Sequence, residues 1–400
     1  MHWLQRQDDG SIDLSSLQLD IVGFLAILGE GSVLANAQVS TLSKWVFLPR
    51  LMPAPQALMR PSRPQVLEPV RGNVSGIFSG NHREDINHVG NIVCDASNLP
   101  PFSVRVVEIK RTGNNELKSK TKSPLTVVTI LGFIFSSILF GLSIWLDDGM
   151  SLMATILLSL LSSIIGYGNK WQLQLPKRAI KNGKVPRGDV VIRYLKGSFL
   201  VVKCDEDVAR EMYFAPEEIK YLLDHGSAYR LLSLIGTAIF MGGVICLANS
   251  RIELQIAWAG SYMLLGSSYW IVAALPEKFH WDTSCYTVTS ECLSDSNMQK
   301  KGYPSENQTF TQALWKAIVV SKSTKWVLTS DACPHTPAWK NWLRDAEIYS
   351  KSVGVAEKEN MHGVKTWAIP EWDPQSHLVN LLAEQAQHDD DKMAGVVEEV

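Results

Sequence analysis

Residues 125–167 of this chain decide its fold, and they read LTVVTILGFIFSSILFGLSIWL (125–146), DDG (147–149) and MSLMATILLSLLSSIIGY (150–167). The two apolar runs are 22 and 18 residues long, and neither contains a charged residue. A helix rises about 1.5 Å per residue, so the first run exceeds the roughly 30 Å of a hydrocarbon core and the second nearly reaches it. The stretch therefore predicts a membrane hairpin of two transmembrane helices.

A second pair of uncharged runs follows at 231–248 and 254–275, joined by the short polar segment 249–253. Tyr and Trp residues stand near the ends of several runs, where amphipathic rings favour the headgroup layer. We therefore expect an α-helical polytopic membrane protein, with two transmembrane helical hairpins and a small cytosolic α+β part.

The chain before the first hairpin divides into three segments. Residues 1–48 form an N-terminal segment in which 14–34 predicts a buried or interfacial helix, and insertion of this helix into the membrane is the alternative. Residues 49–69 contain six prolines and predict an extended linker, with an SH3-like ligand as the less favoured interpretation. Residues 70–122 are a mixed cytosolic region, in which the β-branched residues of 102–110 predict a strand.

The segment 168–228 between the hairpins is predicted to be a cytosolic insert with a β-hairpin and a helix. The β-branched residues of 189–203 surround a Lys-Gly pair that suits a tight turn. Pro216 is expected to open a short helix that ends before Gly226. We expect the strand at 102–110 to join the hairpin in one sheet, because both leave the same side of the first membrane hairpin.

After the second membrane hairpin, residues 276–388 form a polar, mostly helical cytosolic region. Two prolines there, Pro337 and Pro374, directly follow Thr and Asp, and this arrangement predicts a helix start at each. The acidic residues of 389–400 predict a disordered tail.

Basic residues determine the expected orientation. Residues 105–122 hold six Lys and Arg and residues 171–187 hold five, whereas the turn 147–149 holds none. Because Lys and Arg near span ends stay in the cytosol, we expect a multi-pass membrane protein with both termini cytosolic. The glycosylation motifs at Asn73 and Asn307 should then carry no glycan.

Composition and the predicted spans argue against several classes of function. The net charge of −2 and the pI near 6.5 favour no nucleic-acid partner. Six cysteines are too scattered for a disulfide framework. The spans lack ionisable residues, which disfavours a proton-coupled transporter. Small residues recur in them at four-residue spacing, which predicts close helix packing and allows a homodimer through these helix faces.

The segment 81–88 carries the strongest local concentration of reactive groups. It holds two imidazoles and two carboxylates, those of His82, Glu84, Asp85 and His88. These side chains are candidates for acid–base catalysis, and the two histidines are candidates for a divalent metal. A helix here would carry Glu84 and His88 on one face. A polar turn between strands is the alternative, because the spacing matches no standard zinc motif.

A second, looser group of metal-ligand residue types lies further along the chain, and its spacing is wider than that of structural zinc sites. Its members are His280, Cys285, Cys292, Cys333 and His335. The sequence motifs of phosphate loops, dinucleotide-binding turns and serine hydrolases are missing from the chain. We therefore predict no cofactor and no defined metal site.

Four stretches carry a resemblance to a known group of proteins. They are RPQVLEP (63–69), RGDVVIRY (187–194), the helical stripe Trp339, Trp342 and Leu343, and IPEWDP (369–374). Together with the two hairpins, they make the chain resemble uncharacterised four-span integral membrane proteins of filamentous fungi. The resemblance implies no activity and supplies no catalytic residue.

These observations favour a non-enzymatic membrane scaffold or accessory protein, which presents cytosolic surfaces to a protein partner while the lipid bilayer holds it. The first alternative is a membrane-associated enzyme that acts through the 82–88 cluster on a lipophilic substrate, such as one of secondary metabolism. The second alternative is a small transporter or channel that works as an oligomer.

Overall fold

The computed structural model describes residues 30–94, 98–112, 117–174, 185–293, 305–352, 357–359 and 365–398, together with the short paired strands β1 (Gln5–Arg6) and β2 (Ile12–Asp13). The chain folds into two compact units. Each unit collects three segments that are far apart in the sequence. Unit 1 consists of 1–65, 116–174 and 218–283, and unit 2 of 66–115, 175–217 and 284–400.

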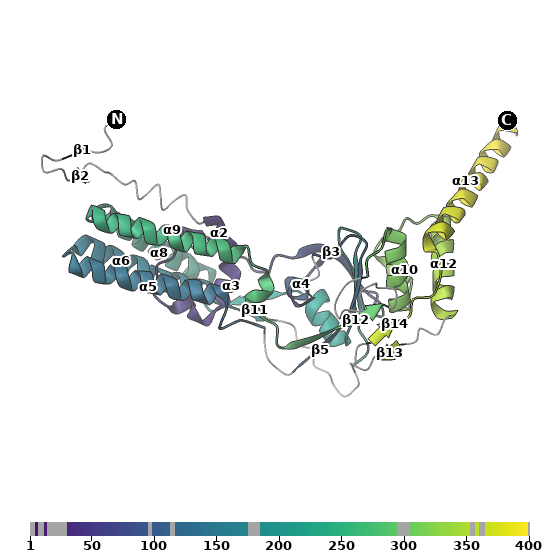
Figure 1. Ribbon diagram of the computed structural model, residues 1–400, viewed down its shortest axis with the longest axis horizontal. Helices are drawn as coiled ribbons and strands as arrows, with labels where there is room; N and C mark the ends of the chain where they lie inside the picture. Colours follow the sequence, from purple (N-terminus) through teal and green to yellow (C-terminus); the bar gives the residue numbers. More distant parts are fainter. Residues whose placement is uncertain are drawn as a thin grey trace. The chain divides into compact units, whose positions relative to one another are not determined.

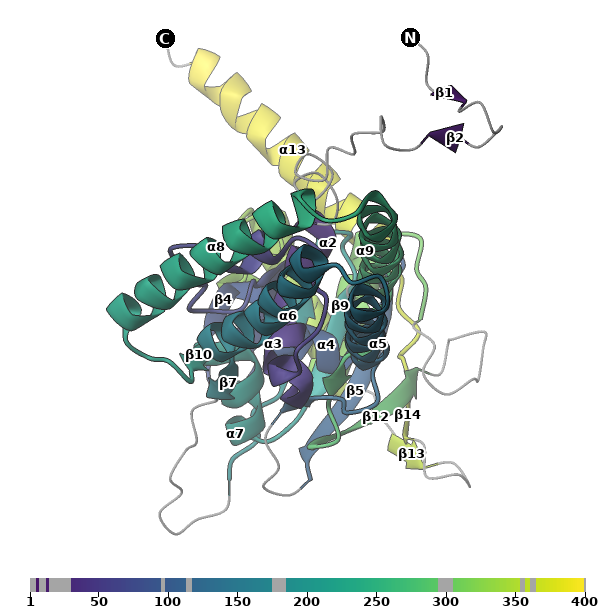
Figure 2. The same cartoon turned by 90° about the vertical axis from the view of Figure 1, so that its left-hand side faces the viewer.

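Unit 1 is built on four long helices that lie side by side (Figures 1 and 2). Their bounds are α5 (Pro124–Trp145), α6 (Gly149–Asn169), α8 (Gly226–Ala248) and α9 (Ile252–Ala273). Within the described residues, α5, α6 and α8 are long and apolar enough to cross a membrane. This property makes the chain compatible with membrane association.

The predicted fold class is wrong, because α9 is not among the helices apolar enough to span and because the α+β part is not small. The predicted span at 254–275 does form a helix. Its first turn carries Glu253 and Gln255, however, and Ser, Gly and Tyr residues dilute its aliphatic content. Unit 2 in turn contains an extended mixed sheet with helices packed on it.

Small and hydroxylated residues line the contact between α5 and α6. The hydroxyls of Ser136 and Ser159 are hydrogen-bonded, and those of Ser143 and Ser151 lie 2.8 Å apart. Asp148 caps the N-terminus of α6. Its carboxylate accepts hydrogen bonds from the backbone N–H groups of Met150 and Ser151 in the first turn. The outer faces of the same helices are apolar and exposed, which reverses the usual arrangement of a water-soluble helix pair.

The proline-rich segment is not the extended linker that was predicted. Residues 50–55 are buried in unit 1, and the Leu51 N–H donates to the carbonyl of Gly132 at 3.1 Å. Gly132 of α5 leaves room for this backbone, because a Cβ there would overlap the carbonyl oxygen of Leu51. The segment is framed by four short helices, α2 (Glu30–Ala35), α3 (Ala37–Leu42), η1 (Lys44–Phe47) and η2 (Pro55–Leu58).

The helix predicted over 14–34 lies largely outside the described residues. Its end, from Glu30 onward, belongs to α2. The helix predicted after Pro216 is wrong, because 218–221 form a strand, β10 (Glu218–Tyr221), antiparallel to β7 (Trp171–Gln174). Ile219 pairs with Leu173, and this cross-strand contact outweighs the local helix-start signal. Unit 1 is completed by β6 (Lys118–Ser119), β11 (Trp281–Asp282) and η4 (Glu277–Phe279).

Unit 2 is organised by one mixed sheet in the order β13-β14-β12-β5-β9-β8-β3-β4. The predicted hairpin is confirmed as the antiparallel pair β8–β9, and the predicted strand at 102–110 joins it as β5, parallel to β9. The bounds are β3 (Val70–Gly76), β4 (His82–Ile86), β5 (Val104–Arg111), β8 (Val190–Arg193), β9 (Phe199–Lys203), β12 (Tyr286–Leu293), β13 (Glu357–Glu359) and β14 (Lys365–Trp367).

Helices cover both faces of this sheet (Figure 1). On one face α10 contributes an unbroken buried run from Ala313 to Ser321 to the core, and on the other α4 and α7 contact β12 and β5. The predicted helix starts at Pro337 and Pro374 are confirmed, whereas the prediction of a disordered tail is wrong because α13 continues to Glu398. The helices of unit 2 are α4 (His88–Cys94), α7 (Glu206–Ala209), η3 (Arg210–Phe214), α10 (Phe310–Ser321), α11 (Lys325–Thr329), α12 (Pro337–Ser352) and α13 (Pro374–Glu398).

Candidate anion-binding site

The face of the unit 2 sheet that α10 covers changes from apolar to charged at one end. On β9, Phe199 and Val201 point into the core, and by strand alternation Lys203 is the next residue on that face. Glu108 of β5 pairs with Lys203 in parallel register. Asp189 directly precedes β8, whose first residue pairs with Val202 of β9. The neighbouring strands β5, β9 and β8 thus place a row of charged side chains at this end of the sheet.

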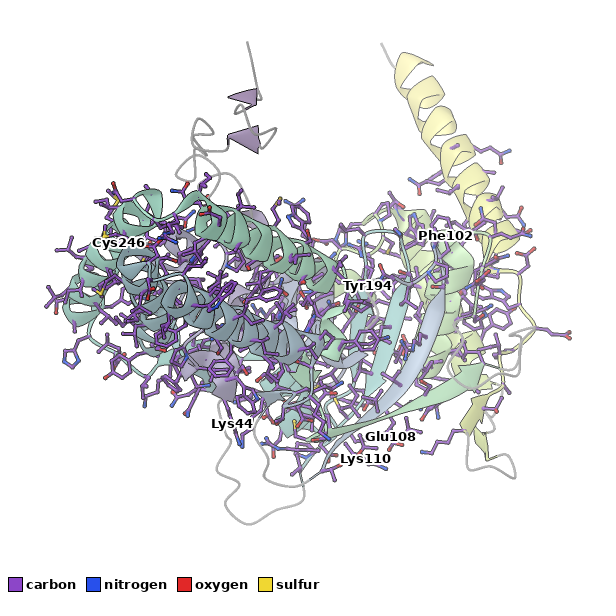
Figure 3. The ribbon with its side chains drawn as sticks, turned by 60° about the vertical axis from the view of Figure 1, so that its left-hand side comes forward. Lys44, Phe102, Glu108, Lys110, Tyr194 and Cys246 are labelled. Carbon is purple, nitrogen blue, oxygen red and sulfur yellow. The ribbon has the colours of Figure 1, made fainter. Side chains whose placement is uncertain are left out.

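A cavity of about 940 Å³ lies over this row, where the helix layer stops at the end of α10. Figure 3 labels Glu108 and Lys110 at this end of the sheet and Phe102 and Tyr194 at the other. Seven basic and four acidic side chains line the cavity, and because Glu291 pairs with Lys203 the surplus is two positive charges. They are Lys110, Arg187, Lys203, Lys322, Lys325, Lys351 and Lys365, with Glu108, Asp189, Asp205 and Glu347.

A buried ion pair forms part of the cavity's wall. Lys203 Nζ lies 3.1 Å from Glu291 Oε2 on β12, and 3.3 Å from the centroid of the Trp367 ring on β14. The Trp367 indole N–H donates to the same carboxylate oxygen at 2.6 Å. Burial of two charges is costly unless further polar contacts compensate it. The indole donor and the aromatic face supply such contacts, so Lys203 is held charged and in a fixed position.

Several charged side chains at the cavity pair with one another. Lys110 lies 2.9 Å from Glu108, and Lys351 lies 2.5 Å from Glu347. Lys322 and Lys325, by contrast, make no ion pair with any carboxylate of the described residues. Both are exposed, at the end of α10 and the start of α11. They therefore supply uncompensated positive charge.

Burial changes the chemistry of two further lining groups. It raises the pKa of the Asp189 carboxyl, although Arg187, 3.6 Å away, and the Cys204 N–H, which donates to Asp189 Oδ1 at 3.2 Å, lower it. Burial also raises the pKa of the Cys204 thiol well above its ordinary value. A neutral thiol is a poor nucleophile. The cavity is therefore equipped to hold an anion more than to attack a substrate.

The 82–88 cluster is divided between a strand and a helix. His82, Glu84 and Asp85 belong to β4, and the buried His88 begins α4, so the helical face required for a Glu84–His88 pair does not form. His82 Nδ1 lies 3.1 Å from Ser75 Oγ on β3. Glu84 and Asp85 line a separate cavity of about 830 Å³ beside Phe102 and Tyr194.

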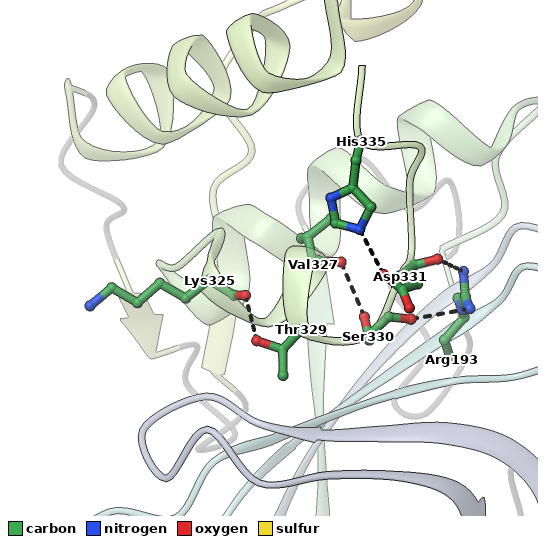
Figure 4. A network of polar contacts seen from close by, with 7 residues as sticks. All are labelled: Arg193, Lys325, Val327, Thr329, Ser330, Asp331 and His335. Carbon is green, nitrogen blue, oxygen red and sulfur yellow. Dashed lines mark hydrogen bonds and ion pairs between the residues drawn. The ribbon is translucent and has the colours of Figure 1, made fainter. Parts of the chain in front are cut away.

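The second candidate group is also dispersed. His335 is exposed and its Nε2 lies 2.7 Å from Asp331 Oδ1, while Arg193 donates to the carbonyls of Ser330 and Asp331 (Figure 4). Burial raises the pKa of Cys333 to about 11. His280 belongs to unit 1 and Cys285 to unit 2, and the Cys292 side chain lies outside the described residues. Across the part of the chain that the structure describes, no three His, Cys, Asp or Glu residues gather as a metal site would require.

Sequence reasoning missed the charged cavity because its parts are far apart in the chain. Lys203 and Glu291 are 88 positions apart, and only strand pairing through β5 brings them together. One local signal was present: Phe-Leu-Val-Val-Lys at 199–203 ends an otherwise apolar strand in a buried lysine. Buried lysines are rare without a partner or a function.

Comparisons with models of protein families, with curated proteins and with solved structures found no match to the chain. The functional interpretation therefore depends on the geometry alone.

Proposed function

We propose that the protein is a non-enzymatic, membrane-anchored binding protein. In this proposal the helices of unit 1 hold it in a bilayer, and the cavity of unit 2 binds a small polyanionic ligand on the cytosolic side. The observation that carries the proposal is the surplus of two positive charges, counted with Glu291, around a cavity of about 940 Å³. The protein partner and the homodimer expected from the sequence stay predictions.

Strand connectivity supports placing all of unit 2 on one side of the membrane. The sheet takes β5 from before α5, β8 and β9 from between α6 and α8, and β12 from after α9. The α5–α6 hairpin must then cross and return. The segment 218–283 must likewise begin and end on the same side, and the basic residues near 105–122 and 171–187 favour the cytosol for that side. The protein would accordingly be multi-pass, with both termini cytosolic.

The ligand class follows from the charge and the size of the cavity. Pockets of about 300–1,000 Å³ typically bind small molecules, and those lined by lysines favour phosphate or carboxylate groups. Two features support binding without catalysis. Lys203 is neutralised by Glu291, so it lacks the free amine that a nucleophile needs, and the raised pKa of Cys204 keeps its thiol neutral.

Calorimetric titration of the full chain in lipid nanodiscs with pyrophosphate tests the proposal. We expect saturable binding that weakens as salt is raised, because exposed charges are screened. The double variant Lys322→Glu/Lys325→Glu should bind about tenfold more weakly or worse, since that change corresponds to about 1.4 kcal/mol.

The matched control is Lys340→Glu, which changes an exposed lysine on α12 that does not line the cavity. It should bind like the unmodified protein. Equal binding by the double variant and the unmodified protein, or no binding of pyrophosphate at low salt, would overturn the proposal.

A further inference from the structure

A second cationic site lies in unit 1, at the ends of two membrane-length helices. The Arg63 guanidinium lies between two aromatic rings, 3.9 Å from the centroid of Tyr221 and 4.1 Å from that of Tyr229. It donates to the carbonyl of Gly168 at 2.6 Å and to that of Leu223 at 2.8 Å. Gly168 is in the last turn of α6, and Leu223 lies just before α8. Arg63 is thereby fixed where both helices end.

The positive charge of Arg63 is only partly compensated. No described carboxylate forms an ion pair with it. Its hydrogen-bond and ring partners are neutral, and Asp224 acts on it without forming an ion pair. Burial lowers the pKa of the guanidinium, and an arginine side chain stays charged in proteins. The arrangement leaves a pre-oriented cation with capacity to attract an anion.

A cavity of about 140 Å³ lies beside Arg63, with more than enough room for the several water-sized atoms of a phosphate group. The charged side chains that line it are both arginines, Arg60 and Arg63, and its lining includes no acidic residue. Arg60 is half exposed, and its ion pair with Glu30, at 3.6 Å, is of the weak surface kind that a ligand phosphate can replace. Trp171 adds an aromatic wall.

A small apolar depression lies next to this cavity, between α6 and α8. It shares Leu58, Asn169 and Tyr229 with the cavity, but its volume is only about 10 Å³, which is too small for an acyl chain. The outer face of α8 is apolar and exposed, for example at Leu231 and Leu234. A cationic head pocket beside an exposed apolar face on helices of membrane length matches the amphipathic form of a phospholipid.

We propose that the Arg60–Arg63 cavity binds the phosphate of an anionic phospholipid whose acyl chains lie against the exposed apolar face of α8. The inference rests on the membrane placement of unit 1 in the proposed function. Choline headgroups are disfavoured, because Arg63 already occupies the tyrosine faces that would take a quaternary ammonium group. Aromatic and basic residues at the ends of spans are also the groups that contact the headgroup layer.

Native mass spectrometry of the full chain in detergent, with phosphatidylglycerol or phosphatidylcholine added, tests this site. We expect one phosphatidylglycerol to remain bound, with a preference of about tenfold or more over phosphatidylcholine, since each basic residue contributes about 1 kcal/mol at such a surface. Arg60→Gln, which changes a half-exposed side chain, should reduce the preference, and Arg60→Gln/Arg63→Gln should abolish it.

Arg230→Gln is the matched control, because Arg230 is exposed on α8 and does not line the cavity. An unchanged preference in the double variant would overturn the inference, and so would displacement of the lipid by inorganic phosphate, which would assign the site to a soluble anion. Alkaline carbonate extraction separates this result from the proposed function. Release of the protein from membranes removes both proposals, whereas retention without lipid preference removes only this one.

Discussion

The two units differ in where their helices place apolar side chains. On α5 the buried positions include Thr129, Gly132, Ser136 and Ser143 beside leucine and valine, while the outer face exposes isoleucine and phenylalanine. In unit 2, α10 buries alanine, leucine, isoleucine and valine against the sheet, and charged residues line the cavity. The apolar residues of α5 thus face outward as well as inward, whereas those of α10 are buried or partly buried.

The contrast is the one expected if unit 1 lies in lipid and unit 2 in water, as we propose. In water, burial of apolar surface drives folding, and unit 2 follows that rule with a continuous apolar core. Between helices surrounded by lipid that driving force is missing, so close packing of small residues and hydroxyl hydrogen bonds hold the interface. In water, the apolar face of α5 would be a large exposed patch of the kind that promotes aggregation.

The largest expected effect comes from a lysine on the exposed apolar face of α5, compared with a lysine on the exposed face of α12. Ile134, near the middle of α5, is 45% exposed, and Ile348 on α12 is 58% exposed. We expect Ile134→Lys to cost about 3 kcal/mol of membrane insertion, because lysine at the centre of a span costs about 2.5–3.5 kcal/mol. Ile348→Lys should change stability by about 0.5 kcal/mol or less.

The carbonate-resistant fraction in microsomes measures the first effect, and urea unfolding of unit 2 measures the second. If both substitutions are tolerated equally, the outer face of α5 does not meet lipid and the comparison between the units fails.

Local patterns predicted the parts of the fold that depend on neighbours in sequence. The hairpin β8–β9 followed from β-branched runs around a turn, and the starts of α12 and α13 from Thr-Pro and Asp-Pro pairs. The position of β5 next to β9 was also predictable, because chain connectivity brought both to one side of a membrane hairpin.

Features set by distant contacts were not predictable in this way. Residues 50–55 carry prolines that are typical of a linker, but they are buried in unit 1, where the backbone of Leu51 packs on Gly132 of α5. The strand β10 carries a helix-start signal that its pairing with β7 overrides. The charged cavity likewise depends on Glu291 and Trp367, which reach Lys203 only through the finished sheet.

A smaller effect tests the close packing in unit 1. A Cβ at Gly166 would overlap the carbonyl oxygen of Val46, whereas a Cβ at Gly141 would meet nothing within 4 Å. We expect Gly166→Ala to destabilise unit 1 by about 1–3 kcal/mol, because backbone must move to relieve the overlap. Gly141→Ala should be neutral or stabilise by about 0.5–1 kcal/mol through helix propensity.

Thermal unfolding in nanodiscs, followed by helical circular dichroism, compares the two variants. Equal midpoints for Gly166→Ala and Gly141→Ala would mean that α6 does not pack closely on η1.

The smallest expected effect concerns a buried carboxyl group of unit 2. Glu217 is buried and accepts from the backbone N–H groups of His88 and Val89, at 3.1 and 2.9 Å, at the start of α4. Burial raises the pKa of its carboxyl from 4.5 to about 7, although these two N–H groups and Arg83 oppose the rise. The folded chain therefore retains this proton at pH values where the unfolded chain has lost it.

The sign of the pH dependence follows from that difference. Stability from the protonated carboxyl is fully present below the unfolded pKa of 4.5, and it is lost as the pH rises through the folded pKa of about 7. Between pH 6 and 8 the loss should amount to about 1.4 kcal/mol. Glu217→Gln, which mimics the protonated form, should remove this part of the slope. Hydrogen exchange at the amides of α4 measures the difference between the two proteins. Parallel pH profiles would mean that the Glu217 carboxyl is as well solvated in the folded chain as in the unfolded one.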